Sequence, residues 1–357
     1  MSDFGRLLLT LPEHLPQGRV TLYGTGDPGL LRDLTSPERE LIVVEETLSA
    51  AALLSQALQG QVLPTDGLPA GTGPFDAVVM RLVKGRVALA LRLREAWAEL
   101  GEGCPLFLYG ANREGVKSAA RAACACFGNV EVVRMASGGR LLRSLKDSKK
   151  VPPPVETREG EPRAIGDGFF GFQASVGGTS LAVASRPGVF SWGGLDPGTE
   201  LLLSHAAVAP GDSVLDLGCG CGVVGAWVGC KCPTCRLMLC DDQVAAVRSA
   251  ERTLALNHVR GEVVLSDGPP PGRFDRILFN APVHRGTKSE HSTAAGLVKA
   301  CRRALGPGGS LDVVAVRGFR VENSLGAFFA TPTLLAEEGN YHLWRAWSAD
   351  GDVERAK

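Results

Sequence analysis

The chain lacks an excess of charge of either sign. Its 357 residues include 38 Lys and Arg and 38 Asp and Glu, so the formal net charge at pH 7 is zero. A balanced total argues against a nucleic-acid binder that relies on overall positive charge, although it would hide a local basic patch. Long hydrophobic runs are also missing, because Gly, Pro or charged residues interrupt the apolar stretches. This pattern predicts no membrane span.

The first residues also lack the features of a secretory signal, since neither a basic start nor a long apolar stretch follows Met1. Without such a signal, the 10 cysteines are expected to be reduced thiols in a cytoplasmic protein. Four of them lie between Cys230 and Cys240 with the spacing C-x-C-x2-C-x4-C. Structural zinc sites usually use two separated pairs of ligands, so we expect no metal here.

A glycine-rich turn stands out in the run 214–225, where an apolar strand pattern is followed by a helix pattern. Gly218, Gly220 and Gly222 have no Cβ atoms, so the turn can adopt unusual dihedral angles and let a ligand approach the backbone. Asp216 precedes the turn on its strand and is expected to organise it. The sequence therefore predicts a nucleotide-type cofactor site.

Two further acidic residues are candidates for the same site. Asp241 follows the apolar strand at 237–240, where a carboxylate can accept hydrogen bonds from ribose hydroxyls. Asp267 follows the strand predicted at 262–266, where an acidic side chain in this fold can meet an adenine amino group. Dinucleotides and S-adenosylmethionine share this geometry, and the glycine spacing separates them only partly.

A polar corner ends the strand predicted at 274–280. Asn280 is followed by Ala281 and Pro282, and the Asn280 side-chain carbonyl and the Ala281 backbone carbonyl can both accept from a planar exocyclic amine. This arrangement would aim the lone pair of the amine nitrogen at a sulfonium methyl group. A hydride-transfer enzyme has no general use for such a corner, so S-adenosylmethionine is favoured. His284, in the following loop, is a candidate contact for a base or a phosphate.

The two halves of the chain repeat one α/β pattern. Strands are predicted at 19–24, 41–46, 75–80 and 105–109, and again at 212–217, 237–240, 262–265, 274–280 and 310–316. Intervening helices predict a Rossmann-like, doubly wound and mostly parallel sheet in each half. An antiparallel edge hairpin is expected from strands near 328–336 and 341–347, and it too favours S-adenosylmethionine.

The predicted domains are 1–150, a linker and lead-in segment at 151–185, and a catalytic domain at 186–357. The first domain is expected to be degenerate. Pro28 stands where the first turn of a helix should offer free N–H groups, and the run Met80-Arg81-Leu82 replaces the Asn-x-Pro corner of the second half. We therefore expect a structural or RNA-docking role for the first domain.

Four further stretches are 107–118 (FLYGANREGVKS), 187–191 (PGVFS), 195–199 (LDPGT) and 280–286 (NAPVHRG). Together with the glycine turn, they resemble the RsmC/RlmG family of ribosomal RNA guanine-N2 methyltransferases over nearly the whole chain. The resemblance implies two tandem class I methyltransferase domains and S-adenosyl-L-methionine as the cofactor. It also implies methylation of the exocyclic N2 amine of a guanine, preferably in small-subunit (16S) RNA, with large-subunit (23S) RNA as the alternative.

The resemblance further implies catalytic roles for Asn280, Ala281, Pro282 and His284, with ribosomal RNA or an assembling ribosomal subunit as the partner. The family pattern at this corner is Asn-Pro-Pro-Phe-His. Ala281 keeps the backbone carbonyl but loses the fixed φ of proline. Val283 replaces an aromatic ring, whose stacking on a base is worth roughly 1–3 kcal/mol. A weakened activity or a shifted substrate is therefore an alternative.

Two other classes of function are open at this point. One is a small-molecule methyltransferase or dehydrogenase that shares only the cofactor turn, and the Asn280 corner and the duplication argue against it. The other is a non-enzymatic RNA-binding or ribosome-assembly protein with a decayed site, and the intact glycines argue against that. Arg113, Lys117 and Arg121 form a basic helix face that suits RNA docking or simple solvation. The internal duplication predicts a monomer.

Overall fold

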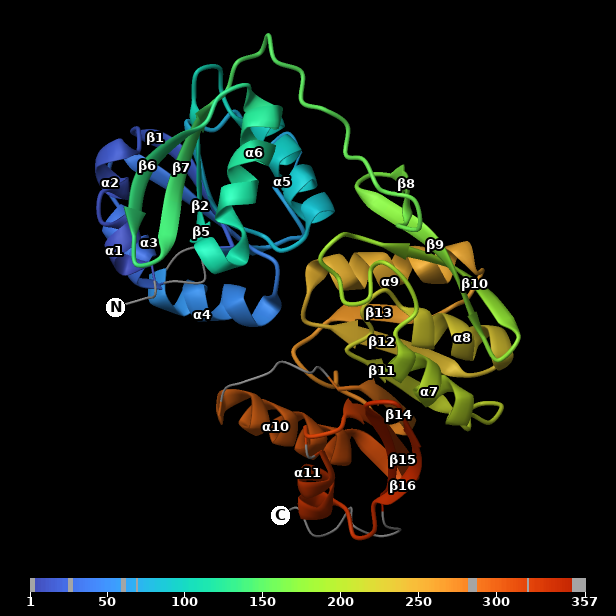
Figure 1. The fold of residues 1–357 in the computed structure, drawn as a ribbon. Helices are drawn as coiled ribbons and strands as arrows, with labels where there is room; N and C mark the ends of the chain where they lie inside the picture. Colours follow the sequence, from blue (N-terminus) through green and yellow to red (C-terminus); the bar gives the residue numbers. More distant parts are fainter. Residues whose placement is uncertain are drawn as a thin grey trace. The chain divides into compact units, whose positions relative to one another are not determined.

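The computed structural model describes residues 4–24, 28–58, 62–68, 70–281, 288–319 and 321–348. The chain divides into two compact units, Met1–Glu159 and Gly160–Lys357. Each unit is built around a seven-stranded sheet (Figure 1). In the described part of the chain, no helix is long and apolar enough to cross a membrane.

The first unit has a mostly parallel sheet with the strand order β3-β2-β1-β4-β5-β7-β6. Its strands are β1 (Gly18–Tyr23), β2 (Arg39–Glu45), β3 (Val62–Pro64), β4 (Ala77–Arg81), β5 (Pro105–Ala111), β6 (Glu131–Ala136) and β7 (Gly139–Leu145). Its helices are α1 (Gly5–Leu8), α2 (Leu11–His14), α3 (Pro28–Leu34), α4 (Leu48–Leu58), α5 (Arg86–Glu99) and α6 (Val116–Phe127), with a 3-10 turn η1 (Asn112–Glu114). Strand β7 pairs antiparallel with both β5 and β6.

The second unit repeats this topology as β13-β12-β11-β14-β15-β17-β16. Its main-sheet strands are β11 (Ser213–Leu217), β12 (Arg236–Asp241), β13 (Glu262–Leu265), β14 (Phe274–Asn280), β15 (Leu305–Val316), β16 (Thr333–Glu338) and β17 (Tyr341–Trp347). Its helices are α7 (Pro197–His205), α8 (Val223–Lys231), α9 (Val244–Leu256), α10 (Lys288–Ala304) and α11 (Val321–Phe328). The shared strand order confirms the predicted fold class and duplication.

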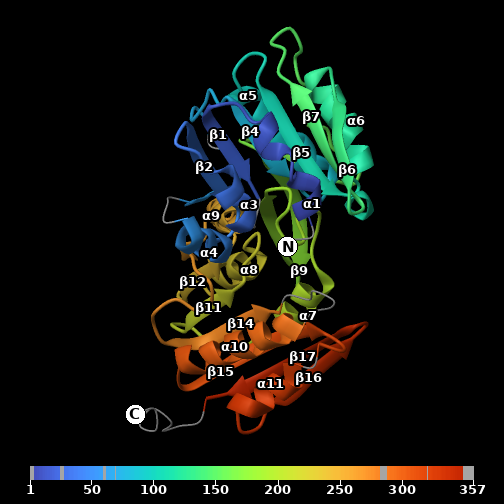
Figure 2. The ribbon, with the colours of Figure 1, turned by 90° about the vertical axis from the view of Figure 1, so that its left-hand side faces the viewer.

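Both faces of each sheet are covered by helices. Neighbouring strand residues point to opposite faces, so Val214 packs with α7, α8 and α9, whereas Leu215 packs in a separate apolar cluster with α10 and α11. Figure 2 shows α10 and α11 on the same side of the strands. In the first unit, Val79 packs with α1 to α4 and Val78 with α5 and α6. Burial on both faces explains why central strands such as β4 and β11 are mostly apolar.

The segment expected as a linker at 151–185 has two structured parts. Arg94 on α5 donates hydrogen bonds to the carbonyls of Pro152 and Pro153, at 2.7 and 2.5 Å, which fastens this stretch to the first unit. The rest forms an antiparallel sheet of β8 (Arg163–Gly166), β9 (Phe169–Val176) and β10 (Thr179–Ser185). The Thr253 hydroxyl on α9 accepts from the Ala184 amide at 3.0 Å, which joins this small sheet to the second unit.

The last elements are shifted from their predicted places. The first strand of the edge hairpin, expected from 328, begins at Thr333, and α11 at Val321–Phe328 precedes it. Pro332 immediately precedes that strand and has no N–H to donate, which is consistent with pairing that starts after it.

Hydrogen bonds after the second strand of each sheet identify equivalent positions in the two units. The Thr65 amide donates to the Glu45 carbonyl at 2.8 Å, and the Ser266 amide donates to the Asp241 carbonyl at 2.9 Å. The order of strands and their register then match Leu22 to Asp216 and Arg81 to Asn280. The first unit therefore has the apolar Leu22 where the second has Asp216. It has the cationic Arg81 where the second has Asn280.

Arg92 occupies the edge of the first sheet at which this fold binds cofactors. Its side chain is 3% exposed and donates to the Tyr23 hydroxyl at 2.6 Å, to the Glu46 carboxylate at 3.3 Å and to the Asp66 carbonyl. These partners follow or end β1, β2 and β3. Both carboxylate oxygens of Glu95 also lie 2.9 Å from its guanidinium. The guanidinium thus fills the space among the loops that would otherwise surround a ligand.

Replacing Arg92 with Leu should destabilise the first unit by up to about 3–5 kcal/mol, because it removes the buried guanidinium and leaves the half-buried Glu46 and Glu95 without their counter-charge. The matched control is Arg143→Leu, which breaks an ion pair with Glu131 in which both side chains are at least 36% exposed. That loss should be below about 1 kcal/mol. Urea unfolding followed by circular dichroism measures both values, and equal losses would contradict a structural role for the buried network.

Candidate active site

The candidate site lies at the carboxyl ends of β11, β12, β13 and β14. These strands are parallel neighbours, so their carboxyl ends meet at one edge of the sheet. The edge brings together the glycine-rich turn after β11, Asp241 at the end of β12, Asp267 after β13 and Asn280 at the end of β14. Pro282 and His284, also predicted for this site, lie outside the described residues.

Asp216 joins the strand to the helix that follows the turn. It is 3% exposed, and its Oδ2 atom accepts a hydrogen bond from the Gly225 amide on α8 at 3.0 Å. Burial raises the pKa of Asp216 to about 7, with a smaller rise from the Asp241 charge, while the bond from Gly225 acts in the opposite direction. The Asp216 carboxyl group thus links the end of β11 to the start of α8, on either side of the turn.

Asp241 holds the same turn from the neighbouring strand. Its Oδ2 atom accepts from the Gly220 amide, and its Oδ1 atom accepts from the Gln243 amide, both at 3.0 Å. Burial raises the pKa of Asp241, against the effect of these two bonds. Asp267 is exposed on the adjoining loop. The acidic residues at 216 and 241 thus shape the turn, and the one at 267 faces solvent.

The three glycines of the turn have different physical roles. Their φ angles are +67° for Gly218, +52° for Gly220 and +78° for Gly222, a region that L side chains rarely adopt. A Cβ on Gly222 would lie 2.8 Å from the Cα of Ala250, so this glycine is required by packing of the turn on α9. Cβ atoms on Gly218 and Gly220 would meet nothing closer than 3.8 Å. Those two positions leave the backbone open to a ligand.

Asn280 is held by the start of α7. Its Nδ2 atom lies 2.9 Å from Asp196 Oδ2 and 2.9 Å from Thr199 Oγ1. A carboxylate can only accept, so the amide must present its NH2 group to α7 and its Oδ1 atom in the other direction. Asn280 therefore offers an acceptor at the edge of the sheet. The sequence motif 195–199 was noted, but its contact with Asn280 was not predicted.

Ala281 continues the ladder beyond Asn280. Its amide donates to the Val314 carbonyl at 2.9 Å, and the residue is 2% exposed. A proline in this position could not make that bond. The hydrogen bond thus restrains the corner where the family pattern has a proline ring, and the backbone carbonyl of Ala281 is retained.

The cysteines are distributed between the core and the surface. Cys219 and Cys221 in the turn are 7% and 5% exposed, and burial raises the pKa of both thiols. Cys232 and Cys235 face each other across a turn, in which the Cys235 amide donates to the Cys232 carbonyl at 3.0 Å. Among the described residues, no three His, Cys, Asp or Glu side chains gather as metal ligands would.

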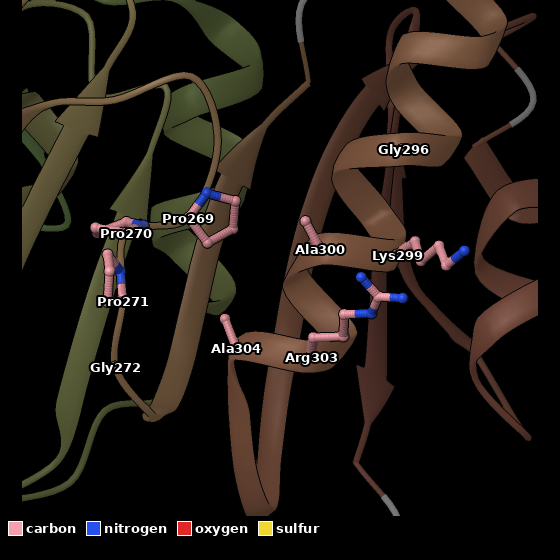
Figure 3. A pocket seen from close by; sticks show the side chains of 9 residues that line it. All are labelled: Pro269, Pro270, Pro271, Gly272, Gly296, Lys299, Ala300, Arg303 and Ala304. Atoms are coloured by element: carbon pink, nitrogen blue, oxygen red, sulfur yellow. The ribbon is translucent and has the colours of Figure 1, made fainter. Parts of the chain in front are cut away.

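A shallow hollow of about 350 Å³ lies elsewhere on the second unit (Figure 3). Three prolines, Pro269 to Pro271, form one side, and Ala300, Ala304, Lys299 and Arg303 of α10 form the other. None of the residues predicted for the cofactor or the catalytic corner lines it. The hollow is therefore separate from the candidate active site.

Comparisons with known proteins agree with this geometry. Residues 180–345 match the methyltransferase small domain, and residues 6–150 match the methyltransferase small domain N-terminal family. The ribosomal RNA small subunit methyltransferase C of Pseudomonas entomophila is 32% identical over 76% of this chain and 79% of its own length. The protein of that name from Pseudoalteromonas atlantica is 26% identical over 96% and 98%.

The chain belongs to the ribosomal RNA small subunit methyltransferase C family. A solved structure from T. thermophilus, described as a 16S rRNA N2 G1207 methyltransferase (RsmC) in complex with AdoMet and guanosine, has a TM-score of 0.81 and 24% identity. It covers 96% of this chain and 92% of that one. The predicted family resemblance and the tandem fold of RsmC are thus confirmed.

The packing role of Gly222 can be separated from its φ angle by comparison with Gly211. Both have positive φ, +78° and +87°, but a Cβ on Gly211 would meet nothing within 4 Å. Gly211→Ala should cost about 1–2 kcal/mol of stability from the backbone alone. Gly222→Ala should cost a further 1–3 kcal/mol, roughly, from overlap with α9. Urea unfolding measures both, and equal losses would show that α9 does not constrain the turn.

The raised pKa of Asp216 predicts a pH-dependent stability of the protein without cofactor. The folded-state pKa of about 7 exceeds the ordinary value of 3.8, so folding favours the protonated carboxyl group. The stability that this group contributes is fully present below pH 3.8 and is lost as the pH rises through about 7. Asp216→Asn cannot ionise and keeps an oxygen for the Gly225 amide. Between pH 4 and 8, the free energy of unfolding of the wild type should therefore fall relative to that of Asp216→Asn by up to about 4 kcal/mol. Parallel pH curves for the two proteins would contradict this.

Proposed function

We propose that the protein transfers a methyl group from S-adenosylmethionine to the exocyclic N2 amine of a guanine in small-subunit ribosomal RNA. The family and the names of its relatives support the substrate class, since those relatives are ribosomal RNA small subunit methyltransferases. Large-subunit RNA was the alternative within the resemblance, and the names of these relatives favour the small subunit.

The observation that carries the proposal is the fixed orientation of Asn280. Its NH2 group is committed to Asp196 and Thr199, so Oδ1 is the atom available to a substrate. An acceptor selects a partner with N–H groups, and an exocyclic amine on a base supplies them. The Ala281 carbonyl adds a second acceptor next to it. Two acceptors that bind the two hydrogens of one amine would leave the nitrogen lone pair perpendicular to the base plane.

The residues of the cofactor edge fit S-adenosylmethionine. Open backbone at Gly218 and Gly220 allows close approach of a nucleoside, and Asp241 and Asp267 stand at the ends of the next two strands, where ribose and adenine would lie. When bound, the cofactor supplies an electrophilic sulfonium methyl group. The protein's task is then to place the amine nitrogen in line with it, and positioning of this kind can supply most of the rate.

The amine would become positively charged when its lone pair forms the new N–C bond, while the bond from the methyl group to sulfur breaks and the neutral thioether leaves. Loss of one proton from the amine would then complete the reaction. Asn280 Oδ1 and the Ala281 carbonyl hold the two N–H groups throughout, and both are neutral acceptors that favour developing positive charge without taking the proton. The proton then passes to solvent. A guanine paired in a helix cannot present N2 in this way, so the target base must be unpaired or flipped out.

The remaining parts of the proposal concern the setting of the reaction. Methyl transfer to an amine requires no metal, and we propose none. We propose that the protein acts in the cytoplasm, where its proposed substrates, ribosomal RNA and assembling subunits, would be met. The two sheets within one chain support action as a monomer, with the first unit as a structural or RNA-docking domain whose basic residues include Arg113, Lys117 and Arg121.

The test is transfer of radiolabelled methyl from S-adenosylmethionine to purified small and large subunits and to their naked RNAs. We expect N2-methylguanosine in small-subunit RNA or an assembly form of it. Asn280→Ala should lower kcat by about 100-fold or more, because it removes a preorganised acceptor from the transition state. Calorimetry should show an unchanged Kd for the cofactor.

Asn340→Ala, at an exposed hairpin turn, serves as the matched control and should keep wild-type kcat. Label in another nucleoside would redirect the proposal to a different base. Absence of label from every RNA, with the cofactor bound, would instead favour the decayed RNA-binding protein considered above.

A further inference from the structure

We infer that Asp196 and Thr199 are positioning residues that orient the Asn280 amide for catalysis. The inference rests on the proposed function, because the purpose of the orientation is to present Oδ1 to the amine of the target base. Both residues come from the N-terminus of α7, more than 80 positions before Asn280, and neither belongs to the strand ends that usually supply the site in this fold.

Asp196 is itself held rigidly. Its Oδ2 atom accepts from the Thr199 amide at 2.9 Å, which caps α7, and Pro197 occupies the first helical position with a φ suited to the helix. The same Oδ2 atom accepts from Asn280 Nδ2 at 2.9 Å. One carboxylate oxygen therefore ties the helix start to the end of β14.

Thr199 supplies the second acceptor for the same NH2 group. It is 9% exposed, and its Oγ1 atom lies 2.9 Å from Asn280 Nδ2. With both amide hydrogens engaged, a 180° rotation of the Asn280 side chain would direct Oδ1 at the Asp196 carboxylate, oxygen against oxygen. Two acceptors that face each other in this half-buried position are costly, so one orientation of the amide is favoured.

Tyr341, on β17, supports Asp196 from the opposite side. Its hydroxyl donates to Asp196 Oδ1 at 3.3 Å, and its ring packs so closely on Gly198 that a Cβ there would lie 2.7 Å away. Burial and the Asp196 charge raise the pKa of Tyr341, so its hydroxyl remains a donor. The edge hairpin thus contributes to the same arrangement.

The first unit provides an internal contrast. The position equivalent to Asn280 is Arg81, whose Nη2 atom pairs with Glu114 Oε1 at 2.9 Å. There the end of the fourth strand is bound to the loop that follows β5, and its side chain offers donors only. The two hydrogen bonds from Asn280 to Asp196 and Thr199, here called the clamp, belong to the unit that has the open glycine turn.

Two pairs of substitutions separate positioning from capping and packing. Thr199→Val is nearly isosteric and removes the acceptor, whereas Thr199→Ser restores it. Asp196→Ser can still cap α7 but its shorter side chain loses Asn280, whereas Asp196→Asn keeps an oxygen for both bonds. We expect T199V and D196S each to lower kcat about tenfold, the effect of one lost hydrogen bond to the amide. T199S and D196N should recover most of that loss.

The KM for RNA and the Kd for S-adenosylmethionine should be unchanged in all four variants, because the ground-state contacts persist. A purely structural role would instead shift the unfolding midpoint and leave kcat unchanged, and a role in cofactor binding would raise the Kd. Either result in T199V, or equal losses in T199V and T199S, would overturn the inference. So would wild-type kcat in both D196S and T199V. An inactive D196N would mean that the charge of Asp196 acts directly, which also contradicts positioning.

A second measurement does not depend on activity. The two Nδ2 hydrogens of Asn280, identified by their absence from the spectrum of N280A, should exchange slowly with solvent in the wild type and faster in T199V and D196S. If the wild type methylates no RNA but shows this pattern, the proposed function fails and the clamp stands. If exchange is equally fast in all proteins, the clamp fails whatever the activity.

Discussion

The hydrogen bond from the Gly225 amide to the buried Asp216 carboxylate is the constraint on which the second unit's site depends. It joins β11 to α8 and sets the path of the chain between them. Asp241 then holds Gly220 from the next strand, so two carboxyl groups define the turn before any ligand is present. The energetic cost is the burial of Asp216, whose raised pKa records how poorly a charge is solvated there.

The duplication shows what the same fold becomes without that constraint. Leu22 stands in place of the acidic residue. Arg92 lies among the loops after β1, β2 and β3, where the Glu46 and Glu95 carboxylates neutralise its charge and the Tyr23 hydroxyl accepts a hydrogen bond from it. A vacant polar edge would be unstable in a folded protein, since buried polar groups need partners. In the first unit the Arg92 side chain supplies those partners. In the second unit the edge is left open to a ligand.

Sequence reasoning predicts the parallel strands, the duplication and the glycine turn because each has a local pattern: apolar runs, glycine spacing and an acidic residue at a strand end. It places Asn280 at the corner for the same reason. The contacts of Asn280 with Asp196 and Thr199, and that of Asp196 with Tyr341, could not be predicted, because they depend on how α7 and β17 pack near the end of β14 and leave no periodic pattern in the sequence. The small sheet at 163–185 was likewise missed, since its short strands resemble a charged, glycine-containing linker.

The departure of the corner from the family pattern has a physical explanation in the ladder between β14 and β15. A proline at 281 would fix φ through its ring, and Ala281 instead donates its amide to Val314. The equivalent residue of the first unit, Leu82, makes the same bond to Tyr109 at 2.8 Å. The fold therefore offers an acceptor at this position in both units, and any residue with an N–H can use it. The proposed reaction uses only the backbone carbonyl of residue 281, which every residue supplies, so the substitution is compatible with that proposal. Asn280 has no such freedom, because only its side chain joins the clamp on α7 to an acceptor for the base.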